Sequence, residues 1–336
     1  MHLVMTLLIG LAGVAVFKLA HLPLPWLLGP MFACLIAALL RVRLTVWMPA
    51  SHAMRTVLGI AIGATITPAL LTQAGSMIVS VLMVPLFILC IAVMGFPLFK
   101  KVYRFDTATS YYAAMPGGLQ DMLLFGEAAG GDVRALSLIH ATRVLTIVAT
   151  IPFVLSFGFD MTIGDTFGTP ALNVPPAQLA LMVGLALGGW WLAARIGLPG
   201  AAILGPMLLG AAASLAGMLA YRPPQEAIVA AQFFIGLGVG VKYVGISLNE
   251  IRRFVAAGLI YSLLAMVIGS VFAAAVMTLG IAPPLEAFLA FAPGGQAEMV
   301  ILAIVTGADV AVVVVHHVCR LATVILGAPL LKRWFR

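Results

Sequence analysis

The stretch from Ala113 to Pro152, AAMPGGLQDMLLFGEAAGGDVRALSLIHATRVLTIVATIP, decides how this chain is organised, because the chain contains it twice. The second copy runs from Ala290 to Pro329 and reads AFAPGGQAEMVILAIVTGADVAVVVVHHVCRLATVILGAP. At a constant offset of 177, the identical residues are Ala113, Pro116, Gly117, Gly118, Met122, Gly130, Asp132, Val133, His140, Arg143, Thr146 and Pro152, which recur as Ala290, Pro293, Gly294, Gly295, Met299, Gly307, Asp309, Val310, His317, Arg320, Thr323 and Pro329. A register held over this length indicates an internal duplication.

The composition around this repeat predicts a membrane protein. Of the 336 residues, 63% are hydrophobic and 9% are charged, whereas soluble domains are roughly 45–50% apolar and about 25% charged. A membrane-spanning helix needs ~20 apolar residues, and the chain offers about ten such runs with short connections. The sequence therefore predicts an all-α polytopic protein without a separate catalytic or DNA-binding domain.

The apolar runs divide into two halves of the same pattern. Residues 1–157 form the first predicted repeat, 158–176 an external linker and 177–336 the second repeat. The predicted spans of the first repeat are 3–20, 25–40, 54–72, 76–98 and 132–156, with a broken segment at 107–128. Those of the second are 178–195, 200–220, 227–247, 254–279 and 308–331, with a broken segment at 284–305.

Topology depends on whether the Pro-Gly-Gly segments cross the bilayer or dip in and return. Basic residues favour cytoplasmic loops, and Arg41, Arg43 and the group from Lys100 to Arg104 mark two such loops. The linker carries Asp160 and Asp165 but no Lys or Arg. These charges favour ten crossings in two inverted five-span repeats, each with a re-entrant or half-helix element, and cytoplasmic N- and C-termini. Arg222 is the one charge that this topology misplaces.

The Pro-Gly-Gly segments are the predicted solute-binding positions. Proline removes a backbone donor and glycine lacks a side chain, so an unwound segment could expose peptide groups, and the restarted helix would present N-terminal amides that favour an anion. The alternative is a tight structural turn whose helix is capped by adjacent polar groups. The predicted site comprises Pro116, Gly117, Gly118, Gln120, Asp121, Pro293, Gly294, Gly295, Gln296 and Glu298.

A second set of duplicated polar residues lies on the long helix that follows each break. His140 and Arg143 share one helix face, as do His317 and Arg320, and they could relay protons or bind a carboxylate. Alternatively, they tie neighbouring helices together by hydrogen bonds. Asp132 and Asp309 precede these helices, where capping and ion coordination are both open readings.

The sequence offers no signature of a cofactor or of nucleic-acid binding. It contains no P-loop, haem-attachment or His-Glu-x-x-His motif. The three cysteines have unrelated spacings, which indicates neither a disulfide framework nor a zinc site. The net charge of +7 is distributed in small groups between apolar runs, so it indicates loop topology rather than direct binding of nucleic acid. We expect neither a cofactor nor a metal, and no enzymatic activity.

The duplicated pattern Pro-Gly-Gly-x-x-(Asp/Glu)-Met followed by His-x-x-Arg, with Leu-Gly-Pro-Met near the start of each half, resembles the bacterial AbrB-type membrane proteins. The resemblance covers nearly the whole chain. It implies a multi-pass inner-membrane protein with a link to gene regulation, and family labels also include ammonia monooxygenase. The chain does not resemble the soluble DNA-binding transition-state regulator that shares the name AbrB.

Three functions compete at this point. The leading hypothesis is a secondary transporter or exporter of a small polar or anionic solute, with H+ or Na+ as a candidate coupling ion and a second copy of the chain as a candidate partner besides the lipid bilayer. The second hypothesis is a membrane-embedded regulator that acts on gene expression indirectly. The third, a membrane monooxygenase, gains no support from the residues, because no cluster of metal ligands is visible.

Overall fold

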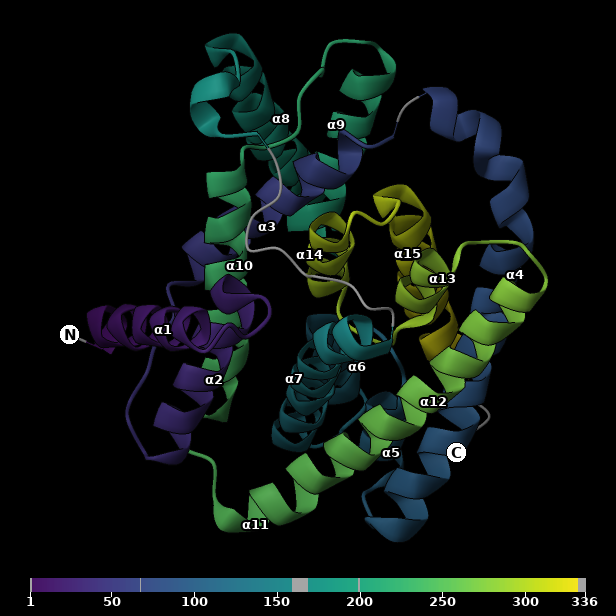
Figure 1. Ribbon diagram of the computed structural model, residues 1–336. Coiled ribbons are helices and arrows are strands. Elements are labelled where there is room, and N and C mark those ends of the chain that lie inside the picture. Colours follow the sequence, from purple (N-terminus) through teal and green to yellow (C-terminus); the bar gives the residue numbers. More distant parts are fainter. Residues whose placement is uncertain (1, 67, 159–168, 199, 332–336) are drawn as a thin grey trace. The chain divides into compact units, whose positions relative to one another are not determined.

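The computed structural model describes residues 2–66, 68–158, 169–198 and 200–331, and Figure 1 labels its helices along the chain. Within these ranges the secondary structure is helical, with no β-strand. The predicted all-α fold class is therefore confirmed.

The helices follow the order expected from the apolar runs. In the first half they are α1 (His2–Leu19), α2 (Pro25–Leu39), α3 (Met48–Gly63), α4 (Pro68–Pro97), α5 (Thr107–Ala114), α6 (Leu119–Ala128) and α7 (Val133–Gly158). In the second half they are α8 (Pro176–Arg195), α9 (Ala201–Leu215), α10 (Gln225–Gly240), α11 (Leu248–Glu250), α12 (Ala256–Thr278), α13 (Pro284–Phe291), α14 (Gln296–Thr306) and α15 (Val310–Leu331). Two π-helical turns, η1 (Leu98–Val102) and η4 (Ile251–Val255), and two 3-10 turns, η2 (Ala171–Asn173) and η3 (Val241–Tyr243), complete the described elements.

The lengths and compositions of these helices make the chain a multi-pass membrane protein. In the described ranges, 7 helical stretches are long and apolar enough to span a bilayer: His2–Leu19, Met77–Val102, Val133–Leu155, Pro176–Arg195, Gln225–Tyr243, Leu248–Thr278 and Val310–Ala328. Helices α2, α9 and α14 are apolar but shorter. The inverted repeats, the number of crossings and the positions of the termini stay predictions, and Asp160 and Asp165 of the linker lie outside the described residues.

The chain folds into two compact units, and each takes segments from both halves of the sequence. Unit 1 contains Met1–Ala74, Ile151–Gly245 and Val300–Ala311. Unit 2 contains Gly75–Thr150, Ile246–Met299 and Val312–Arg336. Both copies of the Pro-Gly-Gly segment belong to unit 2. The division at 157 and 177 describes the sequence repeat, and its use as a domain boundary stays a prediction.

Glycines set the helix packing in unit 1. A Cβ on Gly13 of α1 would lie 2.2 Å from the carbonyl oxygen of Gly29 in α2, and a Cβ on Gly205 of α9 would lie 2.1 Å from that of Gly189 in α8. Neither approach leaves room for a side chain. Membrane helices gain stability from such close backbone packing, because lipid supplies little hydrophobic driving force between them.

Inside unit 1, helices from one half of the sequence pack on helices from the other half. Helix α3 packs on α9, where a Cβ on Gly59 would lie 2.5 Å from the carbonyl oxygen of Ile203. Helix α10 packs on α2, where a Cβ on Gly236 would lie 2.3 Å from that of Leu27. Each contact is the counterpart of the other in the duplicated sequence, so the first half covers the second in the same way that the second covers the first.

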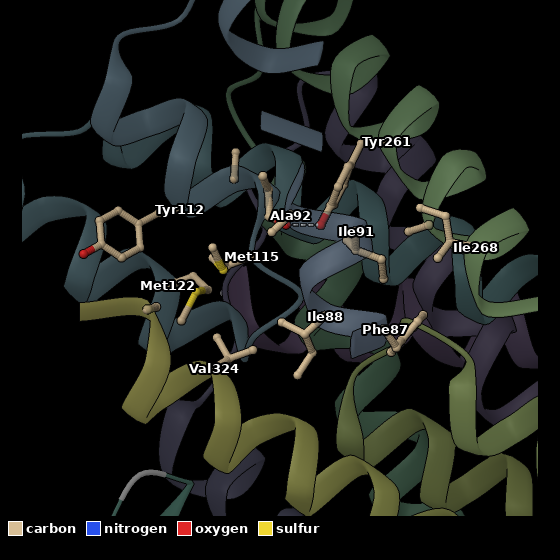
Figure 2. Packing of buried hydrophobic residues seen from close by; sticks show 14 of the residues in the cluster. Phe87, Ile88, Ile91, Ala92, Tyr112, Met115, Met122, Tyr261, Ile268 and Val324 are labelled. Carbon is tan, nitrogen blue, oxygen red and sulfur yellow. Dashed lines mark hydrogen bonds between the residues drawn. The ribbon is translucent and has the colours of Figure 1, made fainter. Parts of the chain in front are cut away.

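Unit 2 has its own apolar core (Figure 2). Phe87 of α4 makes edge contacts with Phe272 of α12 and with Phe291 at the end of α13, each at 5.5 Å between ring centroids. Met122, Val324 and Tyr261 are almost completely buried in the same cluster. This core places α12 beside both Pro-Gly-Gly segments, although the sequence pattern did not mark α12 as functional.

Candidate functional site

In both halves a short helix stops before the Pro-Gly-Gly sequence and a new helix starts after it. Helix α5 ends at Ala114 and α6 begins at Leu119; helix α13 ends at Phe291 and α14 begins at Gln296. We call residues 115–118 the first break and residues 292–295 the second break. Proline fits here because it disfavours helical geometry in the preceding residue and has no N–H to donate.

The second glycine of each break leaves room for an acidic side chain. Asp121 and Glu298 lie three residues after Gly118 and Gly295, in the first turn of the restarted helix. A Cβ on Gly118 would lie 2.5 Å from Asp121 Oδ2, and a Cβ on Gly295 would lie 2.1 Å from Glu298 Oε2. Each carboxylate thus folds back over the start of its own helix, where negative charge is favourable.

The first glycine of each break leaves room for a methionine. A Cβ on Gly117 would lie 2.7 Å from Met122 Cε, and a Cβ on Gly294 would lie 2.5 Å from Met299 Cε. Both methionines are completely buried. The duplicated motif therefore has a local explanation: proline ends one helix, and the two glycines accommodate the methionine and the acid of the next.

An arginine from the following long helix binds each break. Arg143 of α7 donates through Nη1 to the Met115 carbonyl (3.3 Å) and through Nη2 to the Gly117 carbonyl (2.7 Å). Arg320 of α15 donates through the same atoms to the carbonyls of Ala292 (3.0 Å) and Gly294 (2.5 Å). These carbonyls have lost their helical partners, so the guanidinium groups satisfy them and offset the negative ends of α5 and α13.

A histidine one turn earlier binds the preceding short helix. His140 Nε2 lies 3.1 Å from the Tyr112 carbonyl, and His317 Nε2 lies 2.9 Å from the Leu289 carbonyl. Because a carbonyl oxygen can only accept, Nε2 carries the proton in each ring and Nδ1 presents a lone pair when the ring is neutral. Both Nδ1 atoms are buried without a hydrogen-bond partner among the described residues.

The two breaks also share electrostatic neighbours. Arg143 interacts with Glu298 and with Tyr261 of α12, and Arg320 interacts with Arg143, Tyr261 and Glu298. Tyr261 is completely buried and donates its hydroxyl proton to the Ala114 carbonyl at 2.6 Å (Figure 2). Arg143, Arg320 and Glu298 are therefore electrostatic neighbours within unit 2, with Tyr261 as an additional member.

The acidic residues of the two copies differ in exposure. Glu298 is 7% exposed, whereas Asp121 is half-buried. Gln296 carries a buried Nε2 atom without a partner in the described part of the chain. The side chain of Gln120, in the first turn of α6, lies outside what the structure describes. The site is thus nearly symmetric in its arginines and asymmetric in its carboxylates.

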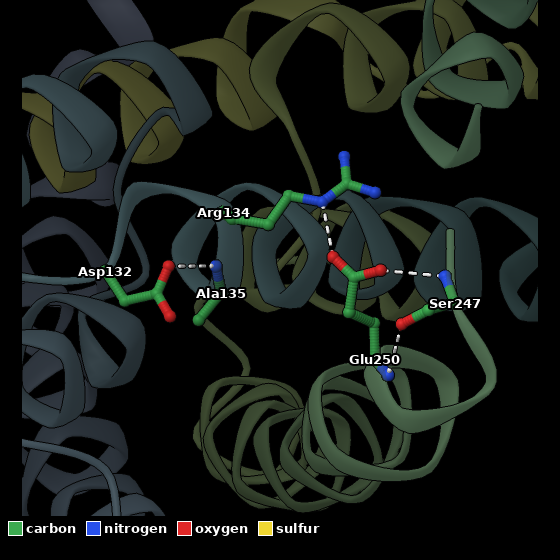
Figure 3. A network of polar contacts seen from close by, with 5 residues as sticks. All are labelled: Asp132, Arg134, Ala135, Ser247 and Glu250. Atoms are coloured by element: carbon green, nitrogen blue, oxygen red, sulfur yellow. Dashed lines mark hydrogen bonds and ion pairs between the residues drawn. The ribbon is translucent and has the colours of Figure 1, made fainter. Parts of the chain in front are cut away.

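Asp132 and Asp309 are exposed, unlike the arginines that bind the breaks. Asp132 Oδ1 accepts a hydrogen bond from the Ala135 amide at 3.0 Å (Figure 3), and Asp309 Oδ1 accepts one from the Ala311 amide at 2.9 Å. Each carboxylate therefore caps the helix that starts at the next residue. Their predicted part in ion coupling has no support in these contacts.

Tyr261 is the member of this group that the sequence analysis missed. Its position in the first half is Val84, so the duplication gave no signal for it. A tyrosine in an otherwise apolar helix needs a hydrogen-bond partner when buried, and that requirement was the one available indication.

In the described ranges, no group of three or more His, Cys, Asp and Glu residues is arranged to hold a metal ion.

Comparison with known proteins adds a family context to this geometry. The family described as "Transition state regulatory protein AbrB" matches residues 26–336. A protein of Escherichia coli (strain K12), named as a candidate regulator, AbrB, is 26% identical over 349 residues, which cover 98% of this chain and 94% of that protein. The protein YhjN of Bacillus subtilis (strain 168) is 26% identical over 349 residues, which cover 96% of this chain and 90% of that protein.

Proposed function

The chain belongs to the AbrB family, and from that premise we propose that it is a secondary transporter of a small anionic solute, with a binding site at the two breaks of unit 2. One observation carries the proposal: two buried arginines are held by equivalent hydrogen bonds in the two copies, and they are electrostatic neighbours of each other and of a buried carboxylate, Glu298. An ionised side chain deep in a bilayer costs about 2.5–3.5 kcal/mol on insertion scales, and such residues mark solute or ion pathways in membrane proteins.

The charge balance supports an anion. Arg143 and Arg320 carry two positive charges, and Glu298 offsets one of them, so this group has a positive excess. Each arginine holds its break through two hydrogen bonds, and Arg143 Nε remains buried without a partner among the described residues. A carboxylate or a phosphate would complete that donor set.

The broken helices supply the second part of the proposed site. The first-turn amides of α6 and α14 favour negative charge, and in this structure Asp121 and Glu298 lie over those helix starts. We propose that the solute competes with these carboxylates as the repeats alternate access across the membrane, an expectation that rests on the predicted inverted topology. The unpaired His140 and His317 nitrogens are candidates for accepting a coupled proton.

A matched pair of acid variants tests the proposal. The full-length protein in detergent is heated with a panel of mono-, di- and tricarboxylates, amino acids and inorganic phosphate, because a ligand of the folded state raises the unfolding temperature. Compounds that raise it are then measured for flux in vesicles. Neutralising the buried acid in Glu298→Gln removes a competing negative charge, so anion affinity should rise by about tenfold, or about 1.4 kcal/mol.

Asp121→Asn is the control, because it removes the equivalent but half-buried acid. We expect it to change affinity by no more than about threefold, since solvent partly screens the charge of a half-buried acid. Equal effects of the two variants, or a panel in which no anion binds and crosses the membrane, would refute the proposed site.

The second candidate function is indirect regulation of gene expression, favoured by the name of the Escherichia coli relative. A regulator without transport predicts that deletion changes transcripts while uptake and efflux of every panel compound stay unchanged. If the protein is a transporter, the transcript changes should depend on the concentration of the transported solute. A strain carrying Glu298→Gln, whose solute flux is altered, should then not show the wild-type transcript response.

A further inference from the structure

Both π-helical turns of unit 2 carry a pair of basic residues. Turn η1 follows α4 and contains Lys100 and Lys101, and turn η4 precedes α12 and contains Arg252 and Arg253. Their positions do not differ by the repeat offset of 177, so the duplication does not explain why they resemble each other. Isolated π turns are rare and occur frequently at functional sites.

Direct contacts join the segment after η1 to η4. Arg253 Nη2 donates to the carbonyl of Arg104 at 3.4 Å, and the Arg253 guanidinium lies 4.9 Å from the centroid of the Phe105 ring. Phe105 in turn contacts Phe254, with 5.7 Å between ring centroids. The ring and the carbonyl hold the guanidinium in place, while its remaining N–H groups have no partner among the described residues.

The backbone of Arg104, whose carbonyl accepts this hydrogen bond, has an unfavourable conformation. Its φ of 54° is in the left-handed region, which residues other than glycine rarely occupy and which persists only where the surroundings impose it.

The surface formed by these residues has unpaired positive charge. Lys101, Arg104, Arg252 and Arg253 are exposed, and we refer to them together as the basic surface. The nearby acids have other partners: Asp106 accepts from the amide and the hydroxyl of Thr109, and Glu250 is bound by Arg134 and by Ser247 (Figure 3).

We propose that the basic surface binds the phosphate of an anionic phospholipid head group. It lies at the ends of two long apolar helical stretches, Met77–Val102 and Leu248–Thr278, where a chain leaves the hydrocarbon and meets the head groups. Val102 (67% exposed) and Leu248 (71% exposed) extend the same segments with apolar side chains, which suit a lipid better than a free phosphate ion. Clusters of Lys and Arg beside membrane helices recognise anionic lipids in this way.

The test compares two double variants that remove the same charge. Full-length wild type, Arg252→Gln/Arg253→Gln and Arg41→Gln/Arg43→Gln, in detergent, are titrated with phosphatidylglycerol or phosphatidylcholine, and lipid retention is measured by native mass spectrometry. Wild type should retain phosphatidylglycerol preferentially. Loss of Arg252 and Arg253 should weaken that binding about 25-fold, since each basic residue near an anionic surface contributes about fivefold, whereas loss of the exposed Arg41 and Arg43 should weaken it less than about threefold.

A third variant separates lipid recognition from charge alone. Phe105→Leu leaves the charge unchanged but removes the ring under Arg253, and it should weaken phosphatidylglycerol binding about threefold, as expected for a cation–π contact at an exposed site. Equal retention of both lipids by wild type would overturn the proposal. So would equal losses in the two double variants, or displacement of phosphatidylglycerol by an equimolar concentration of inorganic phosphate.

Discussion

The first and second breaks are held by equivalent contacts, and they differ in the partner of one carbonyl and in the burial of one acid. In both, a histidine and an arginine of the next long helix bind carbonyls at equivalent positions. The carbonyl of Ala114, just before the first break, accepts a hydrogen bond from the Tyr261 hydroxyl. The equivalent carbonyl of Phe291, just before the second break, instead lies against Gly269, where a Cβ would be only 2.5 Å away. The comparison shows that duplication retained the anchoring of both interruptions and allowed their surroundings to differ.

The difference in the acids has a functional implication. Both acids lie over the starts of their own helices. Glu298 is buried and is an electrostatic neighbour of both arginines, whereas Asp121 is half-buried. A symmetric pair of anchors with one interacting carboxylate gives a single charged centre rather than two equivalent ones. If this comparison holds, the variants should rank by how deeply the lost contact is buried.

The largest effect should come from removing either anchoring arginine. Arg143→Ala and Arg320→Ala each leave two buried carbonyls without a donor, and each should lower the free energy of unfolding by about 3–5 kcal/mol. Unfolding temperatures and denaturant titrations in detergent measure the loss. The Arg→Lys variants are the controls, because an ammonium group retains the charge but does not span two carbonyls. Each Lys variant should therefore lose about half as much free energy of unfolding as the corresponding Ala variant. A large loss at one arginine and none at the other would contradict the equivalence of the breaks.

Tyr261→Phe should affect the first break more than the second. It removes one hydrogen bond and leaves the Ala114 carbonyl buried, so we expect a loss of about 1–2 kcal/mol. Hydrogen exchange of the α5 and α13 amides locates the effect. A larger acceleration of exchange in α5 than in α13 is the expected result, and equal acceleration in both helices would show that Tyr261 does not distinguish the breaks.

Asp132→Ala and Asp309→Ala should have equal and smaller effects. Each removes an exposed N-cap, which is worth about 1 kcal/mol. The Asn variants are the controls, because asparagine caps nearly as well as aspartate. Should flux in vesicles fall in Asp132→Asn while stability is retained, the carboxylate would have a role beyond capping.

The smallest effect should come from Arg134, which lies on the same helix as Arg143. Its Nε is 2.6 Å from Glu250 Oε1, but its side chain is 43% exposed. Exposed ion pairs contribute less than about 1 kcal/mol, so Arg134→Gln should lower the unfolding temperature only slightly and lose even that difference at high salt. A loss as large as that of Arg143→Ala would mean that burial does not set the ranking.

The sequence predicted the order of the helices because hydrophobic runs of spanning length are a strong local signal. It was wrong to place one span at 54–72, because α3 ends at Gly63 and α4 begins at Pro68. The repeat located both breaks because identical residues recur at one offset. It left open whether His140 and Arg143 bind a neighbouring helix or a solute, since partners far apart in the chain are not visible in a local pattern. Tyr261 was missed for the same reason. The π turns were also invisible, because the residues of η1 and η4 have no composition that distinguishes them from ordinary helix.

Met122 and Met299 provide each interruption with a chemical reporter. Their thioethers are shielded while they cover Gly117 and Gly294, and a peroxide reaches sulfur only where solvent does. Sulfoxide formation adds a readily weighed oxygen atom. Brief peroxide treatment followed by peptide mass spectrometry would therefore report, without any substitution, when the chain uncovers each of the two glycines.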